Sequence, residues 1–271
     1  MRSPTPLDQP RAIGQARVGV RSRGSVTAID TLRQSGALKL LFPRQSTRVE
    51  AVLVNTAGGI TGGDRFDTEA TAGAGSDLTV TTQAAERAYR AQTGQTGTVR
   101  NRLAAQGEAT LRWLPQETIL FDGASLKRDL RVDLAETARF LMVEPVLFGR
   151  QAMGEDVRQL YFSDRINVRR EGTPVFRDGL HFDGDAAAEL DKPAVADGAR
   201  AMASLLWIAP GAGGALGATR DIIGHAGGAS LPAPDILVCR LLAQDGFELR
   251  QKLVPLLDHL TQNNLPRCWR L

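Results

Sequence analysis

Carboxylates occupy the positions of this sequence that most suggest chemistry. Glu144 falls between the apolar segments 140–143 and 145–148. A charge inside an otherwise apolar strand must be paired, face water or line an internal polar space. Two interpretations of Glu144 therefore stay open: a structural ion pair with Arg150 or another arginine, and a place on the wall of a polar passage.

A second carboxylate, Asp64, closes a glycine-rich loop over residues 55–65 that follows the apolar run 49–54. Glycine tolerates positive φ and close backbone approach, so the pattern predicts a strand that enters a tightly folded loop. A phosphate-binding loop is disfavoured, because the Lys-Ser/Thr pair of a P-loop is missing and a strand-like run follows instead of a helix. A hairpin that needs glycine only for its backbone geometry remains the alternative. The structural glycines of this loop are Gly58, Gly59, Gly62 and Gly63.

Two further acids are weaker candidates. Asp178 precedes Gly179, and its simplest role is to begin a turn. Glu86 precedes Arg87, with which it could form an ordinary surface pair.

The other reactive residue types form no recognisable site. None of the three histidines lies within four residues of another His or Cys, so the sequence contains no local pair of such metal ligands. No Gly-x-Ser-x-Gly, no His-Glu-x-x-His and no Ser/His/Asp arrangement is found. We therefore expect no catalytic residue and no tightly bound cofactor.

Composition narrows the class of protein. The chain carries a net charge of +3, and its hydrophobic content of 42% is that of an ordinary globular protein. No basic run alternates with aromatic residues, so nucleic acid is not an expected partner. The sequence contains no 18-residue apolar run, no signal-peptide pattern and only two cysteines. We therefore expect no membrane partner and a cytoplasmic location.

Alternation of apolar and polar residues predicts that the elements that position these acids are β-strands. Short runs such as 109–113 and 130–134 alternate strictly, which is typical of half-buried strands. Many short strands are compatible with a sandwich, a barrel or an irregular stacked-sheet solenoid. No repeat of fixed length is visible, which disfavours a regular propeller or a regular β-helix.

The chain divides into three predicted regions within one domain. Residues 1–15 are expected to be disordered, residues 16–190 to form a β-rich body, and residues 191–271 to pack on that body as strand, helix, strand and helix. Asp245 is a suitable N-cap for the last helix, which Pro255 is expected to kink or to shorten in its first half.

Three segments, residues 55–65, 81–90 and 113–124, together resemble the UreD family of urease accessory proteins, called UreH in some organisms. The loop corresponds to the family's Pro-x-Gly-Gly-x-x-Gly-Gly-Asp, although it starts here with Asn55 to Ala57 instead of the commoner Pro-containing form. The block 113–124 matches nearly letter for letter, and residues 265–270 look like the family's Pro-Arg-x-Trp terminus.

The resemblance implies a non-catalytic assembly factor that binds apo-urease and a partner, UreF, and recruits the GTPase UreG. It implies a mainly β fold, an irregular stacked-sheet, β-helix-like solenoid with a small C-terminal α/β segment containing two helices. It also implies transient passage of nickel(II) along acidic side chains. Carboxylate oxygens suit transit because they bind nickel less tightly than imidazole or thiolate. The candidate positions for this passage, from the firmest match to the weakest, are Asp64, Glu144 and Asp178. Glu86 ranks last, because it occupies a position at which the family varies.

A purely structural chaperone that opens apo-urease without conducting nickel is the alternative function.

Overall fold

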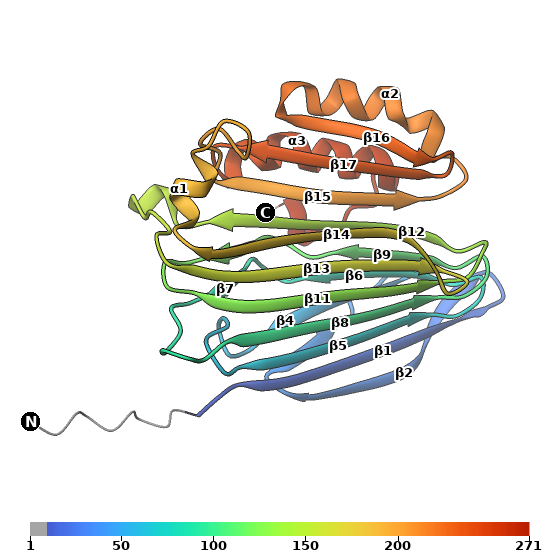
Figure 1. Ribbon diagram of the computed structural model, residues 1–271. Helices are drawn as coiled ribbons and strands as arrows, with labels where there is room; N and C mark the ends of the chain where they lie inside the picture. The colour runs from blue at the N-terminus through green and yellow to red at the C-terminus, as the bar shows by residue number, and fades with distance from the viewer. Residues whose placement is uncertain (1–9, 271) are drawn as a thin grey trace, which may run out of the picture.

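The computed structural model describes residues 10–270, whose chain winds between two facing β-sheets as a solenoid of about four turns (Figure 1). The first sheet has the strand order β14 (Thr173–Gly184), β13 (Leu160–Arg170), β11 (Ser125–Leu134), β8 (Gly97–Ala105), β5 (Arg65–Ala72), β1 (Ile13–Arg23) and β2 (Val26–Gly36). The second sheet has the order β16 (Gly227–Ala233), β17 (Ile236–Ala243), β15 (Ala201–Ile208), β12 (Arg139–Phe148), β9 (Thr110–Leu114), β6 (Asp77–Thr82), β4 (Val49–Asn55) and β3 (Leu38–Leu41).

Successive coils of the solenoid stack in parallel but differ in length. Thr98 lies beside Arg65, 33 residues earlier in the chain, whereas Leu126 lies beside Gly97, 29 residues earlier. The next coil is longer again, because Tyr161 lies beside Ser125, 36 residues earlier. These unequal coils explain why the sequence shows no repeat of fixed length.

A narrow third side closes the space between the two sheets. It contains two short strands, β7 (Glu86–Ala88) and β10 (Thr118–Leu120), which pair with each other in parallel. Ile60 of the glycine loop forms a parallel bridge to Ala88, and Thr118 lies beside Val146 of β12. Loop 55–65, segment 81–90 and block 113–124 are therefore neighbours in space, although about thirty residues separate each from the next.

Strand β12 is buried on both faces, which accounts for its nearly continuous apolar run. Met142 and Val146 point into the core between the two sheets, whereas Leu141 and Val143 point into a second core beneath the helices. Glu144 has the same phase along the strand as Met142 and Val146, so it points between the sheets.

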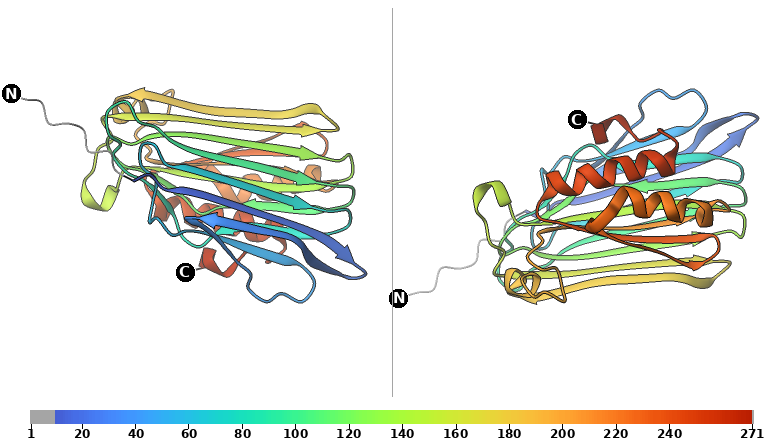
Figure 2. Two further views of the ribbon diagram at one scale, coloured as in Figure 1. Left: turned by 90° about the horizontal axis from the view of Figure 1, so that it is seen from below. Right: turned by 90° about the horizontal axis from the view of Figure 1, so that it is seen from above.

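Two helices, α2 (Ala212–Ile223) and α3 (Gly246–Thr261), cover the outer face of the second sheet over strands β15, β16 and β17 (Figure 2). Asp245 caps the longest helix, because its carboxylate accepts the backbone N–H of Glu248 at 2.8 Å. Pro255 lies inside this helix, which is continuous over its full length. The α-helices are α1 (Ala186–Leu190), α2 (Ala212–Ile223) and α3 (Gly246–Thr261), and the 3₁₀ turns are η1 (Gln151–Met153), η2 (Gly224–Ala226) and η3 (Arg267–Arg270).

The predicted fold class, a mainly β stacked-sheet solenoid with C-terminal helices, is confirmed. The alternation pattern did not reveal β16, which forms a hairpin with β17. The predicted disordered segment 1–15 falls mostly on residues 1–9, which lie outside the described residues, and β1 begins at Ile13 within it. Within residues 10–270, no helix combines the length and the apolar character that crossing a membrane requires.

The C-terminal turn is fastened to the solenoid by Trp269. Its indole Nε1–H donates to the carbonyl oxygen of Leu114 at 3.0 Å, and the Arg250 guanidinium lies 5.3 Å from the ring centroid. Arg250 also donates from Nε and Nη2 to the Glu117 carboxylate, at 2.6 and 2.9 Å. Block 113–124 therefore anchors α3 and the terminus as well as forming part of the third side.

We expect Trp269→Ala to lower the free energy of unfolding by about 3–5 kcal/mol, because it empties a buried site and removes one of the two side-chain donors to the Leu114 carbonyl, leaving only the Thr81 hydroxyl. Urea denaturation followed by circular dichroism measures this change. Phe247→Ala is the control, since Phe247 is 71% exposed on α3 and its loss should change stability little. Equal effects of the two substitutions would contradict the anchoring role.

Candidate functional site

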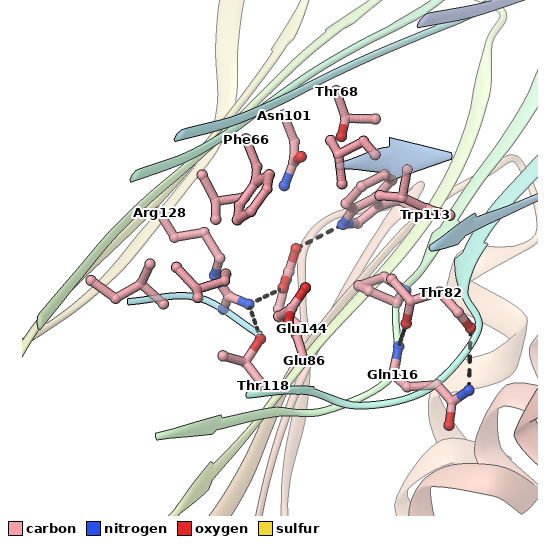
Figure 3. Close-up of a pocket in the computed structure, with 16 residues that line it drawn as sticks. Phe66, Thr68, Thr82, Glu86, Asn101, Trp113, Gln116, Thr118, Arg128 and Glu144 are labelled. Carbon is pink, nitrogen blue, oxygen red and sulfur yellow. Dashed lines mark hydrogen bonds and ion pairs between the residues drawn. The ribbon is translucent and has the colours of Figure 1, made fainter. Parts of the chain in front are cut away.

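A cavity of about 70 Å³ with a mixed, mostly apolar wall lies between the sheets, next to the third side (Figure 3). That volume is enough for several water molecules. Its wall combines apolar residues with three charged groups, Glu86, Arg128 and Glu144. The uncharged polar residues of the wall are Thr68, Thr82, Asn101, Gln116 and Thr118.

The glycine loop closes the solenoid beside this cavity. Ile60 donates its N–H to the carbonyl of Arg87 at 2.7 Å and accepts the N–H of Tyr89 at 2.7 Å. Gly59 has φ +154°, and a Cβ there would lie 2.3 Å from the Tyr89 ring. A Cβ at Gly62 would lie 2.7 Å from the Cβ of Gln95. Glycine is thus required where the loop stacks against the next coil.

Asp64, the firmest match to the family motif, is hydrogen-bonded through both carboxylate oxygens to backbone N–H groups. The buried carboxylate accepts the N–H of Ala12 on Oδ1 and the N–H of Thr61 on Oδ2, both at 2.8 Å. Asp64 is absent from the residues that line the cavity. Its geometry is that of a residue that fixes the loop.

Glu86, by contrast, lies on the boundary between the cavity and the surface. It lines both the internal cavity and an open pocket of about 360 Å³ beside the glycine loop. Its carboxylate accepts the Asn55 side-chain amide at 3.1 Å and the Arg87 N–H at 3.1 Å. Burial raises the pKa of the Glu86 carboxyl, against the effect of these two hydrogen bonds. The two hollows also share Leu38, Leu53 and Thr82 in their walls.

Glu144 forms the inner wall and is only 4% exposed. Its Oε1 accepts the indole N–H of Trp113 at 2.7 Å, and its Oε2 lies 2.7 Å from Nη1 of Arg128. Burial raises the pKa of the Glu144 carboxyl, and the attraction of Arg128 only partly offsets this effect. Figure 3 shows the carboxylates of Glu86 and Glu144 directed into the same space.

Arg128, rather than Arg150, is the ion-pair partner of Glu144. The Arg128 guanidinium donates to Asp164 from Nε, at 2.9 Å, and from Nη2, and Nη1 donates to the hydroxyl of Thr118 at 3.0 Å. Burial disfavours the charged guanidinium, but the two carboxylates outweigh it and raise the pKa of Arg128. Arg150 instead pairs with Glu155 at 2.9 Å.

Asp178 lies away from the cavity wall. It does not begin a turn but sits within β14, opposite Ile166 of β13. Its carboxylate pairs with Arg240 of β17 and accepts the Ser204 hydroxyl at 3.2 Å. Asp178 therefore ties the edge of the first sheet to the second. The structure brings together two of the four predicted acids, Glu86 and Glu144, and places Asp64 and Asp178 elsewhere.

No group of three or more His, Cys, Asp or Glu side chains among residues 10–270 is arranged to hold a metal ion. The polar cavity residues that lie outside every motif and candidate position named from the sequence are Thr68, Asn101 and Arg128. Arg128 had a readable signal, because it occupies the inward phase of β11 between Leu126 and Leu130.

We expect Asp64→Asn to lower the free energy of unfolding by about 1–3 kcal/mol, because one backbone N–H then faces an amide NH₂ instead of an acceptor. Urea denaturation measures the loss, and hydrogen exchange at the Thr61 amide should become faster. Asp67→Asn is the control, since Asp67 lies on the outer face and its only ion pair within residues 10–270, with Arg100, spans 4.0 Å. Wild-type stability of Asp64→Asn would refute the loop-fixing role.

Comparison with known proteins places these features in one family. The family model described as UreD urease accessory protein matches residues 12–270. A urease accessory protein UreD from Roseobacter denitrificans is 60% identical over 271 residues, which cover 100% of this chain and 99% of the relative. UreD proteins from a Ruegeria species and from Agrobacterium fabrum are 53% and 44% identical, covering 97% and 98% of this chain and 91% and 94% of the relatives. The chain belongs to the UreD family of urease accessory proteins.

Proposed function

We propose that this chain is a non-catalytic scaffold of urease maturation that also passes nickel(II) toward the urease active site. In this role it binds apo-urease and UreF and recruits the GTPase UreG in the cytoplasm. Family membership supports the role in urease maturation. The cavity of the solenoid supports the nickel route.

The observation that carries the route is the position of Glu86. Its carboxylate belongs to the wall of both the surface pocket and the internal cavity, and Glu144 lies on the wall of that same cavity. A cation that enters beside the glycine loop therefore meets Glu86 first and Glu144 next. Both acids are largely removed from solvent, where their attraction for a cation is weakly screened.

The chemistry of these two acids favours passage over storage. Nickel(II) is bound strongly by imidazole and thiolate, and the described cavity wall offers carboxylate, amide and hydroxyl oxygens instead. The small volume restricts the cation to a partly hydrated state, in which water molecules share its coordination with the wall. Transient coordination by one or two carboxylates is the outcome we expect.

The purely structural alternative also has support in the fold. Asp64, Asp178 and the Glu117–Arg250 pair all hold backbone segments or elements together. A chaperone that only opens apo-urease would need such rigidity and no internal route.

The double substitution Glu86→Gln and Glu144→Gln separates these functions. Each change preserves side-chain shape and removes a charge, so complexes with UreF and apo-urease should form normally. We expect urease matured with this variant to contain about tenfold less nickel at limiting nickel supply, the factor that corresponds to roughly 1.4 kcal/mol of lost interaction. Metal analysis of purified urease and co-purification of the partners are the two measurements.

Asp178→Asn is the matched control, because it also removes one partly buried carboxylate but lies off the cavity wall. It should leave the nickel content of urease unchanged. Intact complexes with fully nickel-loaded urease in the double variant would favour the structural alternative.

A further inference from the structure

The guanidinium of Arg128 is attached unequally to its two acidic neighbours. Asp164 accepts a bidentate hydrogen bond from Arg128: Nε donates to Oδ1 at 2.9 Å, and Nη2 donates to Oδ2. Thr118 accepts from the remaining nitrogen, Nη1, at 3.0 Å. Paired N–H donors on one carboxylate form a strong and geometrically specific contact. Arg128 is thus fixed in place without Glu144.

The contact with Glu144 is of a different kind. Oε2 lies 2.7 Å from Nη1, yet among the described residues it has no partner with hydrogen-bond geometry. The other oxygen, Oε1, is held by Trp113. Glu144 therefore presents one buried oxygen to the cavity that is held by charge attraction alone, so a second cation can compete for it.

We propose that Arg128 is an internal counter-cation that weakens nickel binding at Glu144 and so lets the ion leave. The inference rests on the proposed nickel route. Arg128 stays bound to Asp164 while a passing nickel ion contacts Oε2 of Glu144. The fixed positive charge a few ångströms away repels that ion, and in a site shielded from water this repulsion is strong.

Asp164 sets the strength of this effect. It lies behind Arg128 and outside the cavity wall, where it neutralises part of the guanidinium charge. Removing Asp164 alone exposes Glu144 to the full positive charge. Removing Arg128 and Asp164 together takes away both the repulsion and the unpaired acid that would otherwise remain buried. The two changes should therefore shift nickel affinity in opposite directions.

The test is a competition titration of the full-length chain, co-purified with UreF where needed, using nickel sulfate against a chromophoric chelator. We expect the double substitution Arg128→Met and Asp164→Asn to bind nickel at least about tenfold more tightly than the wild type, and Asp164→Asn alone to bind it more weakly. Adding Glu144→Gln to the double variant should abolish the gain. Unchanged or weaker nickel binding by the double variant would overturn the proposal, and so would tighter binding by Asp164→Asn. If one of these two variants does not fold, the nickel affinity of the other still tests the proposal by itself.

Two comparisons keep the outcome specific. Arg170→Met with Asp235→Asn removes another partly buried Arg–Asp pair, joined at 2.6 Å, that does not line the cavity, and it should leave nickel affinity unchanged. The proposed route is judged separately by the nickel content of urease matured with Glu86→Gln and Glu144→Gln. Full nickel loading of urease matured with that variant would contradict the proposed nickel route. The changes in nickel affinity, by contrast, test only the proposed role of Arg128.

Discussion

The central constraint on this molecule is the burial of a cluster of three charged side chains inside the solenoid. Arg128, Glu144 and Asp164 come from β11, β12 and β13 and are each less than 10% exposed. Breaking such a cluster on one side would leave an uncompensated buried charge, which is strongly destabilising. The coils must therefore stack in one register, since a slip of one residue would turn these side chains toward the other face of their strands.

The same register brings loop 55–65, segment 81–90 and block 113–124 together on the third side. The glycine loop, β7 and β10 stack in that order, and each contributes residues to the cavity or to its rim. Asp64 holds the first of these layers by two backbone hydrogen bonds, and Arg250 holds the third through Glu117. Rigid support for a small internal space is thus built from residues that never touch that space.

Much of this architecture could be predicted from the sequence. Strict alternation predicted the strands, and the glycine spacing predicted the strand–loop–strand unit, because both are local patterns. The family resemblance named four acids but could not say which of them share a cavity. That depends on coils of unequal length, which bring Glu86 beside Thr118 and Arg128 beside Asp164. The ranking of the four acids also failed to anticipate that both oxygens of a carboxylate at the end of a loop can accept backbone N–H groups, as they do at Asp64. The alternation of β11 already indicated that Arg128 points inward, but its ion pairs with Glu144 and Asp164 depend on the neighbouring strands β12 and β13.

Anomalous X-ray diffraction from crystals of the full chain exposed to nickel sulfate tests the central claim most directly. The account predicts a nickel peak inside the solenoid, in contact with Oε2 of Glu144 or with the carboxylate of Glu86, while Arg128 remains bonded to Asp164. Nickel bound only to surface side chains, with the cavity free of anomalous signal under saturating conditions, would contradict it.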